Sequence, residues 1–162
     1  MFYTMLASPV GELLLAGDED ALHVVGFPSG RGAARPEEDW TENPAPFAEA
    51  ARQLGDYFAG KRRSFDLPLA PSGTPFQRDV LAALQQIPYG ETRSYGELAK
   101  SVGRPKASRA VGAANGRNPL PIVIPCHRAI GSDGSLTGFG GGLATKRFLL
   151  DLERRHAGAG LL

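Results

Sequence analysis

Short apolar runs separated by turn-forming residues occupy the first part of the chain. The runs are Met1–Leu6, Glu12–Ala16 and Leu22–Phe27, and proline, glycine and aspartate lie between them. Runs of this length with such breaks are typical of short β-strands joined by tight turns. The pattern therefore predicts a small antiparallel sheet at the N-terminus.

Helical spacing replaces this pattern after a long polar stretch. Residues Pro28–Pro46 are rich in glycine, proline, arginine and glutamate, which indicates an irregular surface loop. Phe47–Phe58 follows with apolar residues three and four apart, which predicts a helix. The side chains expected on its buried face are Ala48, Ala51, Leu54, Tyr57 and Phe58. Lys61–Pro71 then alternates apolar and other residues, and this pattern fits either an edge strand or an extended linker.

A clear helix start follows at Thr74. Thr74 is a good N-cap, Pro75 suits the first helical position, and Gln77 completes a capping box. The side chains expected to face the core from this helix are Phe76, Val80, Leu81, Leu84 and Ile87. Pro88 and a glycine shortly after it end the pattern.

Two short helices and a final longer one complete the predicted elements. Tyr95–Val102 and Lys106–Asn115 flank a break at Gly103–Pro105, and Ala144–His156 has helical spacing near the end of the chain. Two short helices around a glycine-containing turn are typical of a helix-turn-helix, whose second helix commonly enters a groove of DNA. An ordinary helical hairpin in the core gives the same pattern.

The stretch Ala70–Gly73 predicts a boundary between an N-terminal region, residues 1–71, and a C-terminal region, residues 72–162. The fold class predicted is α+β: a small antiparallel sheet plus a helix, then a mostly helical, winged-helix-like region. The net charge of +1 conceals a contrast, because the first region holds 6 Lys and Arg against 11 Asp and Glu and the second 12 against 6. This favours contact of the basic region with a polyanion, although charges on solvated faces give the same imbalance.

The chain has a single cysteine, Cys126, directly behind a proline and the apolar run Ile122–Ile124. One cysteine cannot form an intramolecular disulfide or a multi-cysteine zinc site, and we expect neither a metal nor a cofactor. A thiol needs a base or a positive neighbour to become a nucleophile. His127 and Arg128 adjoin it, and Glu153 on the last predicted helix is the candidate to hold the imidazole. A buried, inert cysteine fits the same local pattern.

The segment Asn118–Gly142, NPLPIVIPCHRAIGSDGSLTGFGGG, resembles the signature of the O6-alkylguanine-DNA alkyltransferases, also called methylated-DNA–protein-cysteine methyltransferases. The similarity extends back through IPYGETRSYGELA and SRAVGAANGRNP and forward through LATKRFLLDLE, so it covers Thr74–Glu153. The first 70 residues match only in general style. The resemblance implies DNA repair by direct, irreversible transfer of an alkyl group from O6-alkylguanine, and also from O4-alkylthymine, to a cysteine. The target base is flipped out of the duplex, and each molecule acts once.

Carried over residue by residue, the resemblance implies a catalytic group around the thiol. Cys126 accepts the alkyl group, His127 is the general base acting through a water molecule, and Glu153 orients His127. Tyr95 helps to rotate the target nucleotide at its phosphate and is a proton donor near the base. Asn118 precedes the reactive strand and fixes the active-site turn.

The resemblance also implies a DNA surface and a base pocket. Arg109 enters the duplex from the minor groove and fills the space of the extruded base, so little sequence preference is expected. The residues implied at the DNA are Tyr95, Lys106, Ala107, Ser108, Arg109, Gly112 and Asn115. Those implied around the base are Asn118, Ile130, Phe139, Gly140 and Gly141. Many relatives carry tyrosine in place of Phe139, whose missing hydroxyl removes a contact to the base edge, and the glycines after it predict room for bulky O6 groups.

Three other functions stay open on the sequence: a lesion-binding module that transfers nothing, a sequence-specific regulator using the helix-turn-helix, and a cysteine hydrolase using Cys126, His127 and Glu153. No apolar run approaches the roughly 18–20 residues that span a bilayer, and the first residues lack the basic start of a signal peptide. We therefore expect a soluble, cytoplasmic protein that does not bind membranes. The expected partner is double-stranded DNA bearing alkylated guanine, bound by a monomer, with clustering on DNA left open.

Overall fold

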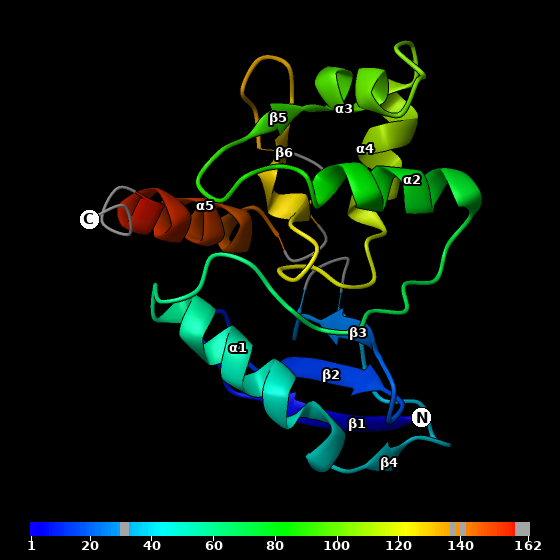
Figure 1. Cartoon of the computed structure of the whole chain (residues 1–162), viewed down its shortest axis with the longest axis vertical. Helices are drawn as coiled ribbons and strands as arrows, with labels where there is room; N and C mark the ends of the chain where they lie inside the picture. The colour runs from blue at the N-terminus through cyan, green and yellow to red at the C-terminus, as the bar shows by residue number, and fades with distance from the viewer. Residues whose placement is uncertain (30–32, 137–138, 140–141, 158–162) are drawn as a thin grey trace.

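The computed structural model describes residues 1–29, 33–136, 139 and 142–157. A sheet with one helix forms one end of the molecule, and the other helices form the opposite end (Figure 1). An extended segment connects the two ends. No helix among the described residues is long and apolar enough to cross a membrane.

The N-terminal sheet has the strand order β3-β2-β1-β4. The three predicted strands are confirmed as β1 (Phe2–Leu6), β2 (Leu13–Gly17) and β3 (Leu22–Gly26), which pair antiparallel. A fourth strand, β4 (Thr41–Glu42), pairs parallel to β1 and makes the sheet mixed. This strand lies inside the predicted loop, and two exposed residues are too few to produce an alternating pattern.

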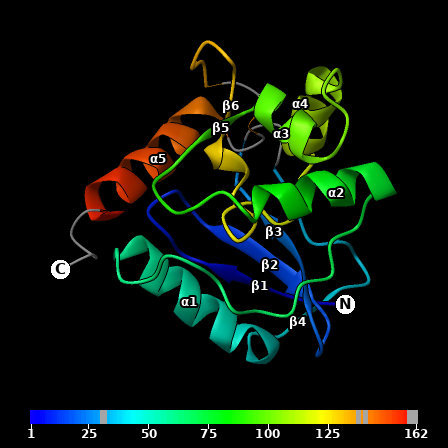
Figure 2. The ribbon, with the colours of Figure 1, turned by 45° about the horizontal axis from the view of Figure 1, so that its top comes forward.

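The predicted helix of the N-terminal region consists of a 3₁₀ turn, η1 (Ala45–Phe47), followed by α1 (Ala48–Phe58). Figures 1 and 2 show α1 lying across one side of the sheet. Its fully buried side chains are Ala50, Gln53, Leu54 and Tyr57. The expected burial of Ala48 is wrong. The buried face of the helix runs through Phe47, Ala50 and Leu54, and Ala48 lies on the exposed side.

The two readings of Lys61–Pro71 resolve in favour of an extended linker. It pairs with the sheet through an isolated bridge between Leu69 and Leu22. There the amide of Leu22 donates to Pro68 O (2.9 Å), and the amide of Ala70 donates to Leu22 O (2.9 Å). These two bonds attach the linker to β3.

The C-terminal region begins with α2 (Pro75–Leu84), whose predicted capping box is confirmed. Gln77 N donates to Thr74 Oγ1 (3.1 Å), and Thr74 N donates to Gln77 Oε1 (2.9 Å). The helix-turn-helix consists of α3 (Tyr95–Ser101) and α4 (Ser108–Gly116), and these helices pack on α2.

The second helix of this pair starts later than predicted. Lys106 and Ala107 lie in the turn before α4, because Ala107 N donates to Arg104 O (2.9 Å) and closes a tight turn there. The exposed side of the turn also carries Pro105, which has no amide hydrogen to continue a helix.

Four further elements hold or adjoin the segment that contains Cys126. The two-residue strands β5 (Arg93–Ser94) and β6 (Ala129–Ile130) pair parallel. A 3₁₀ turn, η2 (Cys126–Arg128), carries the cysteine, and α5 (Leu143–Ala157) packs beside it. The last predicted helix therefore matches α5 to within one residue at each end.

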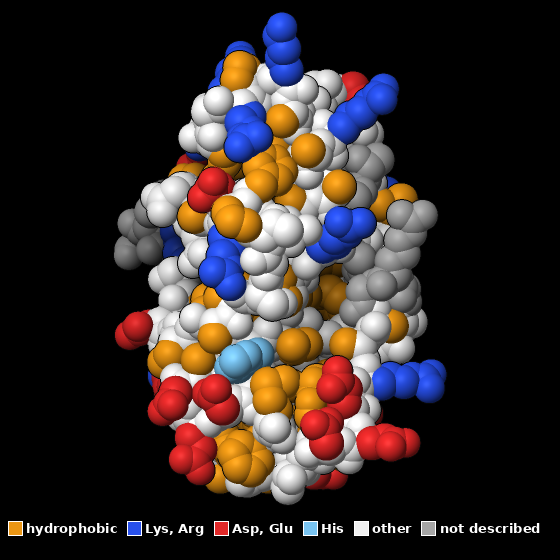
Figure 3. Space-filling model, turned by 90° about the vertical axis from the view of Figure 1, so that its right-hand side faces the viewer, with side chains coloured by type: hydrophobic (Ala, Val, Ile, Leu, Met, Phe, Trp, Pro, Cys, Tyr) orange, Lys and Arg blue, Asp and Glu red, His pale blue; other side chains and the backbone are white. Residues whose placement is uncertain are grey.

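The buried hydrophobic residues form one cluster that extends from β2, through α1 and α2, to α5. The amide of Val25 also donates to Pro119 O (2.9 Å), which links β3 directly to the segment that leads to the cysteine. The sheet end and the helical end therefore share one core. The charges divide as the sequence indicates: on the face in Figure 3, Lys and Arg gather over the helical end and Asp and Glu over the sheet end.

Candidate active site

The apolar run Ile122–Ile124 positions the cysteine by forming a turn. The prediction of a strand before the cysteine is wrong, because Ile122 has φ 74° in the left-handed region and Ile124 N donates to Leu120 O (2.8 Å). A β-branched residue adopts such a φ only when its surroundings enforce it, at a cost of about 1–3 kcal/mol. Asn118 supports the turn: its Nδ2 donates to Ile124 O (2.8 Å), and its Oδ1 accepts from Leu120 N (2.9 Å).

Cys126 itself is 3% exposed and sits at the start of η2. Burial raises the pKa of its thiol to about 11, although a hydrogen bond from Asn118 and the charge of Lys146 oppose the rise. The thiol is therefore protonated at neutral pH and needs a base at the moment of reaction.

His127 and Glu153 form a fully buried pair next to this thiol. Nε2 of His127 lies 2.6 Å from Oε2 of Glu153, and both side chains have 0% exposure. Burial lowers the pKa of His127 although the carboxylate opposes this, so the ring is neutral at neutral pH. Because an ionised carboxylate only accepts hydrogen bonds, Nε2 carries the proton and Nδ1 has a free lone pair. Nδ1 is buried without a hydrogen-bond partner among the described residues, as a general base awaiting a proton requires.

Five hydrogen bonds converge on the carboxylate of Glu153. Oε2 accepts from His127, from Arg128 Nη2 (3.0 Å) and from Tyr57 Oη (2.7 Å). Oε1 accepts from Arg128 Nε (2.8 Å) and from Gly90 N (3.1 Å). Burial acts to raise the pKa of Glu153, but the hydrogen bonds from His127 and Arg128 outweigh it and hold that pKa well below its usual range. The carboxylate stays ionised and keeps the imidazole in one tautomer.

Two groups of this network, and a lysine near the thiol, were missed by the sequence analysis. Tyr57 was expected only as an apolar contact, yet its hydroxyl reaches Glu153; a buried tyrosine hydroxyl needs a partner, and this was the one available signal. Gly90 contributes through its backbone, which no side-chain pattern reveals. Lys146 is buried on α5 and donates to Ala129 O (2.5 Å); burial lowers its pKa to about 8, while the neighbouring Cys126 opposes this.

An open cavity of about 510 Å³ lies beside α4, where most of the residues predicted to meet DNA are found. Tyr95, Ser108, Arg109 and Gly112 line it from α3 and α4, together with the segment Gly131–Asp133. Arg109 is exposed on α4, and Lys106 is exposed in the turn before it. Asn115 is not brought to this surface, because it is 1% exposed and faces the core.

Only some of the residues predicted around the base lie in the part of the chain that the structure describes. Phe139 is 8% exposed and its ring packs against that of Phe27 at a centroid distance of 5.5 Å. Ile130 is half-buried at the end of β6, next to η2. Gly140 and Gly141 lie outside the described residues.

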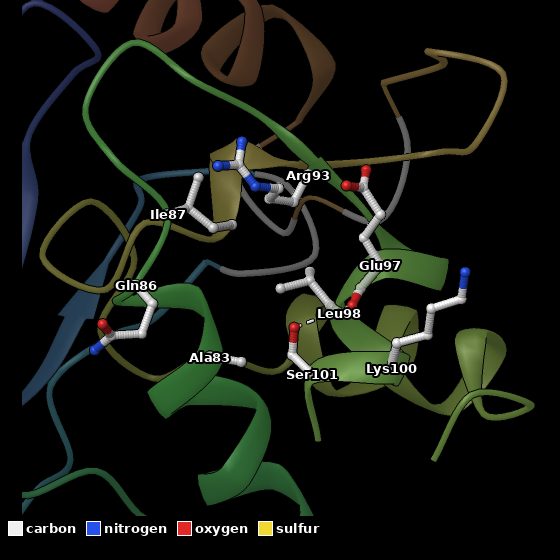
Figure 4. Close-up of a pocket in the computed structure, with 8 residues that line it drawn as sticks. All are labelled: Ala83, Gln86, Ile87, Arg93, Glu97, Leu98, Lys100 and Ser101. Atoms are coloured by element: carbon white, nitrogen blue, oxygen red, sulfur yellow. Dashed lines mark hydrogen bonds between the residues drawn. The ribbon is translucent and has the colours of Figure 1, made fainter. Parts of the chain in front are cut away.

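A second cavity, of about 410 Å³, lies between the end of α2, β5 and α3 (Figure 4). Its charged side chains are Arg93, Glu97 and Lys100, and the carbonyl of Glu97 accepts a hydrogen bond from Ser101 Oγ (3.1 Å). None of the residues predicted for catalysis or DNA binding lines it, so it is separate from the thiol site.

Comparison with known protein families identifies both halves of the chain. Residues 1–71 match the family model described as 6-O-methylguanine DNA methyltransferase, ribonuclease-like domain. Residues 75–155 match the model described as 6-O-methylguanine DNA methyltransferase, DNA binding domain.

Individual relatives agree with these matches. A methylated-DNA–protein-cysteine methyltransferase of Methanosarcina acetivorans is 56% identical over 94% of this chain and 98% of its own length. One of Mycolicibacterium paratuberculosis is 53% identical over 98% of this chain and 96% of its own length. The crystal structure of Mycobacterium tuberculosis OGT in complex with DNA superposes with a TM-score of 0.90 at 47% identity, covering 96% of this chain and 94% of that one.

Proposed function

The chain belongs to the 6-O-methylguanine DNA methyltransferase family, and on that premise we propose that it repairs DNA by moving an alkyl group from O6 of guanine to Cys126. The observation that carries the assignment to Cys126 is a buried thiol in the same 3₁₀ turn as His127, whose imidazole pairs with Glu153. It is also the only cysteine in the chain. Direct transfer to a protein cysteine therefore has one acceptor.

The reaction is an in-line displacement at the alkyl carbon. The thiol proton of Cys126 passes through a water molecule to Nδ1 of His127, and Glu153 stabilises the resulting imidazolium. Sγ forms a bond to the alkyl carbon while the O6–carbon bond breaks, and its electron pair stays on the guanine. A proton from Tyr95 compensates the charge on the leaving base. The product is a thioether.

Irreversibility follows from the same residues. A thioether has no good leaving group, and the chain has no second thiol to displace the alkyl group. Each molecule therefore acts once. A hydrolase using the same three residues would instead form a labile intermediate and turn over.

Access to O6 requires the target base to leave the duplex. Extrusion costs a few kcal/mol, and damaged bases are extruded most readily. Arg109, exposed on α4 at the cavity of about 510 Å³, fills the gap in the stack, while Tyr95 across this cavity guides the nucleotide. Lys106 contacts phosphate from the turn before α4. Reading by extrusion selects the lesion over the sequence, and O4-alkylthymine is accepted by the same chemistry.

The protein acts as a monomer on double-stranded DNA containing the alkylated base, in the cytoplasm. The basic helical end meets the DNA, and the acidic sheet end faces away from it. Clustering of several copies along DNA is compatible with this division of charge. Bulky O6 groups are accepted, because the glycines that follow Phe139 carry no side chains.

A titration of lesion against protein tests the proposal. Duplex DNA with one O6-methylguanine is added in excess, and the repaired strands are counted at completion. One repaired base per protein molecule is expected, and Cys126→Ser should repair none. Repair far beyond one per molecule would indicate turnover, and binding without repair would leave a lesion-binding module.

A further inference from the structure

Tyr57 lies in the sheet end of the molecule but contacts the catalytic carboxylate. It is on the C-terminal turn of α1, which approaches α5 in both Figures 1 and 2. Its hydroxyl donates to Oε2 of Glu153 (2.7 Å), and both side chains are fully buried. The same oxygen accepts the Nε2 proton of His127. One carboxylate oxygen thus joins the sheet end to the active-site base.

The ring of Tyr57 is held so that the hydroxyl has little freedom. Phe58 and Phe65 pack on it with centroid distances of 5.5 Å, and Tyr89 packs edge-on at 6.3 Å. Burial and the nearby Glu153 raise the pKa of Tyr57, so the hydroxyl stays protonated and always donates.

Donation to Oε2 has two consequences for His127. It fixes the oxygen that sets the orientation of the imidazole. It also withdraws charge from the carboxylate, so the carboxylate stabilises the imidazolium less than it would without this donor. The number of donors on Oε2 therefore sets both the direction of Nδ1 and its basicity.

We propose that Tyr57 is a positioning residue for alkyl transfer, through which the sheet end fixes the orientation and basicity of His127. The proposal rests on the function proposed above. It gives the N-terminal region a chemical role beyond supporting the fold.

Tyr57→Phe tests this, with Tyr89→Phe as the matched control. Tyr89 also has a buried hydroxyl, but that hydroxyl has no hydrogen-bond partner among the described residues. Single-turnover transfer is measured against DNA concentration and pH for both variants and the parent protein. For Tyr57→Phe we expect a roughly five-fold slower transfer step, unchanged DNA affinity, and an acid limb of the pH profile shifted to higher pH. Tyr89→Phe should match the parent protein.

The proposal would be overturned if Tyr57→Phe kept the transfer rate and the pH profile of the parent protein. It would also be overturned if Tyr57→Phe and Tyr89→Phe slowed transfer equally. Site-specific 3-fluorotyrosine at position 57 supplies a second test that keeps the packing. Its more acidic hydroxyl donates more strongly, so the acid limb should move to lower pH, and no movement or the opposite movement would also overturn the proposal. The pKa of the His127 imidazole, followed by NMR without DNA, must shift in the same directions. An inactive parent protein would instead defeat the function proposed for the chain.

Discussion

At the scale of single residues, the site holds a neutral thiol beside a neutral base. Burial raises the pKa of Cys126 to about 11 and lowers that of His127 from its usual value of 6.5. Neither group is charged at rest, so the thiol and the imidazole bury no charge before DNA arrives. The carboxylate of Glu153, the one buried anion among the described residues, is matched by Arg128 at 2.8 Å. A thiol activated only during the reaction is also protected from adventitious electrophiles, because the thiolate is the reactive form.

The pH dependence of transfer follows from these two pKa values. Between the pKa of His127 and that of Cys126 both groups are neutral and form the reactive pair, so the transfer rate should be flat around neutral pH. Because burial holds the pKa of His127 below its usual 6.5, the rate should fall only at a pH under that value, where His127 takes up a proton. Single-turnover rates across this range check the expectation. A tenfold rise per pH unit through neutrality would show that a preformed thiolate reacts, and would contradict the role of His127.

At the scale of elements, the basic side chains of α4 and of the turn before it are proposed to meet DNA in two different ways. Lys106 in the turn suits phosphate contact, whereas Arg109 on the helix lines the cavity beside Tyr95. A phosphate contact adds affinity for any DNA. An inserted side chain instead stabilises the duplex from which the base has been extruded. Only a lesion in duplex DNA requires this extrusion before transfer.

Arg109→Ala should therefore slow transfer from duplex DNA at least ten-fold and leave transfer from the free alkylated base nearly unchanged. Arg117→Ala is the matched control, since Arg117 is an exposed arginine at the end of the same helix and lies outside the cavity. Transfer rates on the two substrates check this. Equal losses for both variants, or an equal loss on free base and duplex, would refute the insertion role.

At the scale of the whole molecule, the active site and the junction of the two ends are the same network. Glu153 on α5 accepts from Tyr57 of α1, from Gly90 after α2 and from η2. Arg63 of the linker adds a second attachment, donating to His156 O (3.0 Å) and Ala157 O (2.6 Å) at the end of α5. The contacts that stabilise the fold and the chemistry proposed for His127 therefore involve the same buried carboxylate.

Glu153→Gln should lower the free energy of unfolding at pH 7 by about 3 kcal/mol, because it leaves Arg128 buried without its counter-charge. The pKa of Glu153 is lowered on folding, so its contribution is present above its unfolded pKa of about 4.5 and is lost as pH falls. The difference in the free energy of unfolding between the parent protein and Glu153→Gln should become smaller below that pH. Urea unfolding between pH 3 and 7 checks this, with Glu12→Gln on the surface as control. A difference in the free energy of unfolding that stays constant with pH would contradict this role of the ionised Glu153.

Local signals in the sequence predicted much of the fold. Thr74 and Gln77 specify a helix start by contacts within four residues, and the three long strands show in their apolar runs. The strand β4 was missed because two residues carry no pattern. The start of α4 was placed too early because the predicted break at Gly103–Pro105 extends through Ala107. In the candidate site, Cys126, His127 and Arg128 could be placed together because they are consecutive in the sequence. The bond from Tyr57 to Glu153 joins residues 96 positions apart and depends on how the two ends pack, so no local signal predicts it.

The most direct test of the central claim is the mass of the protein after reaction. The protein is incubated with duplex DNA containing O6-methylguanine, and its intact mass is measured and then mapped by peptide. The account predicts a stable gain of one methylene equivalent, complete at one per molecule and located on Cys126. No gain, or a gain located elsewhere, would contradict it.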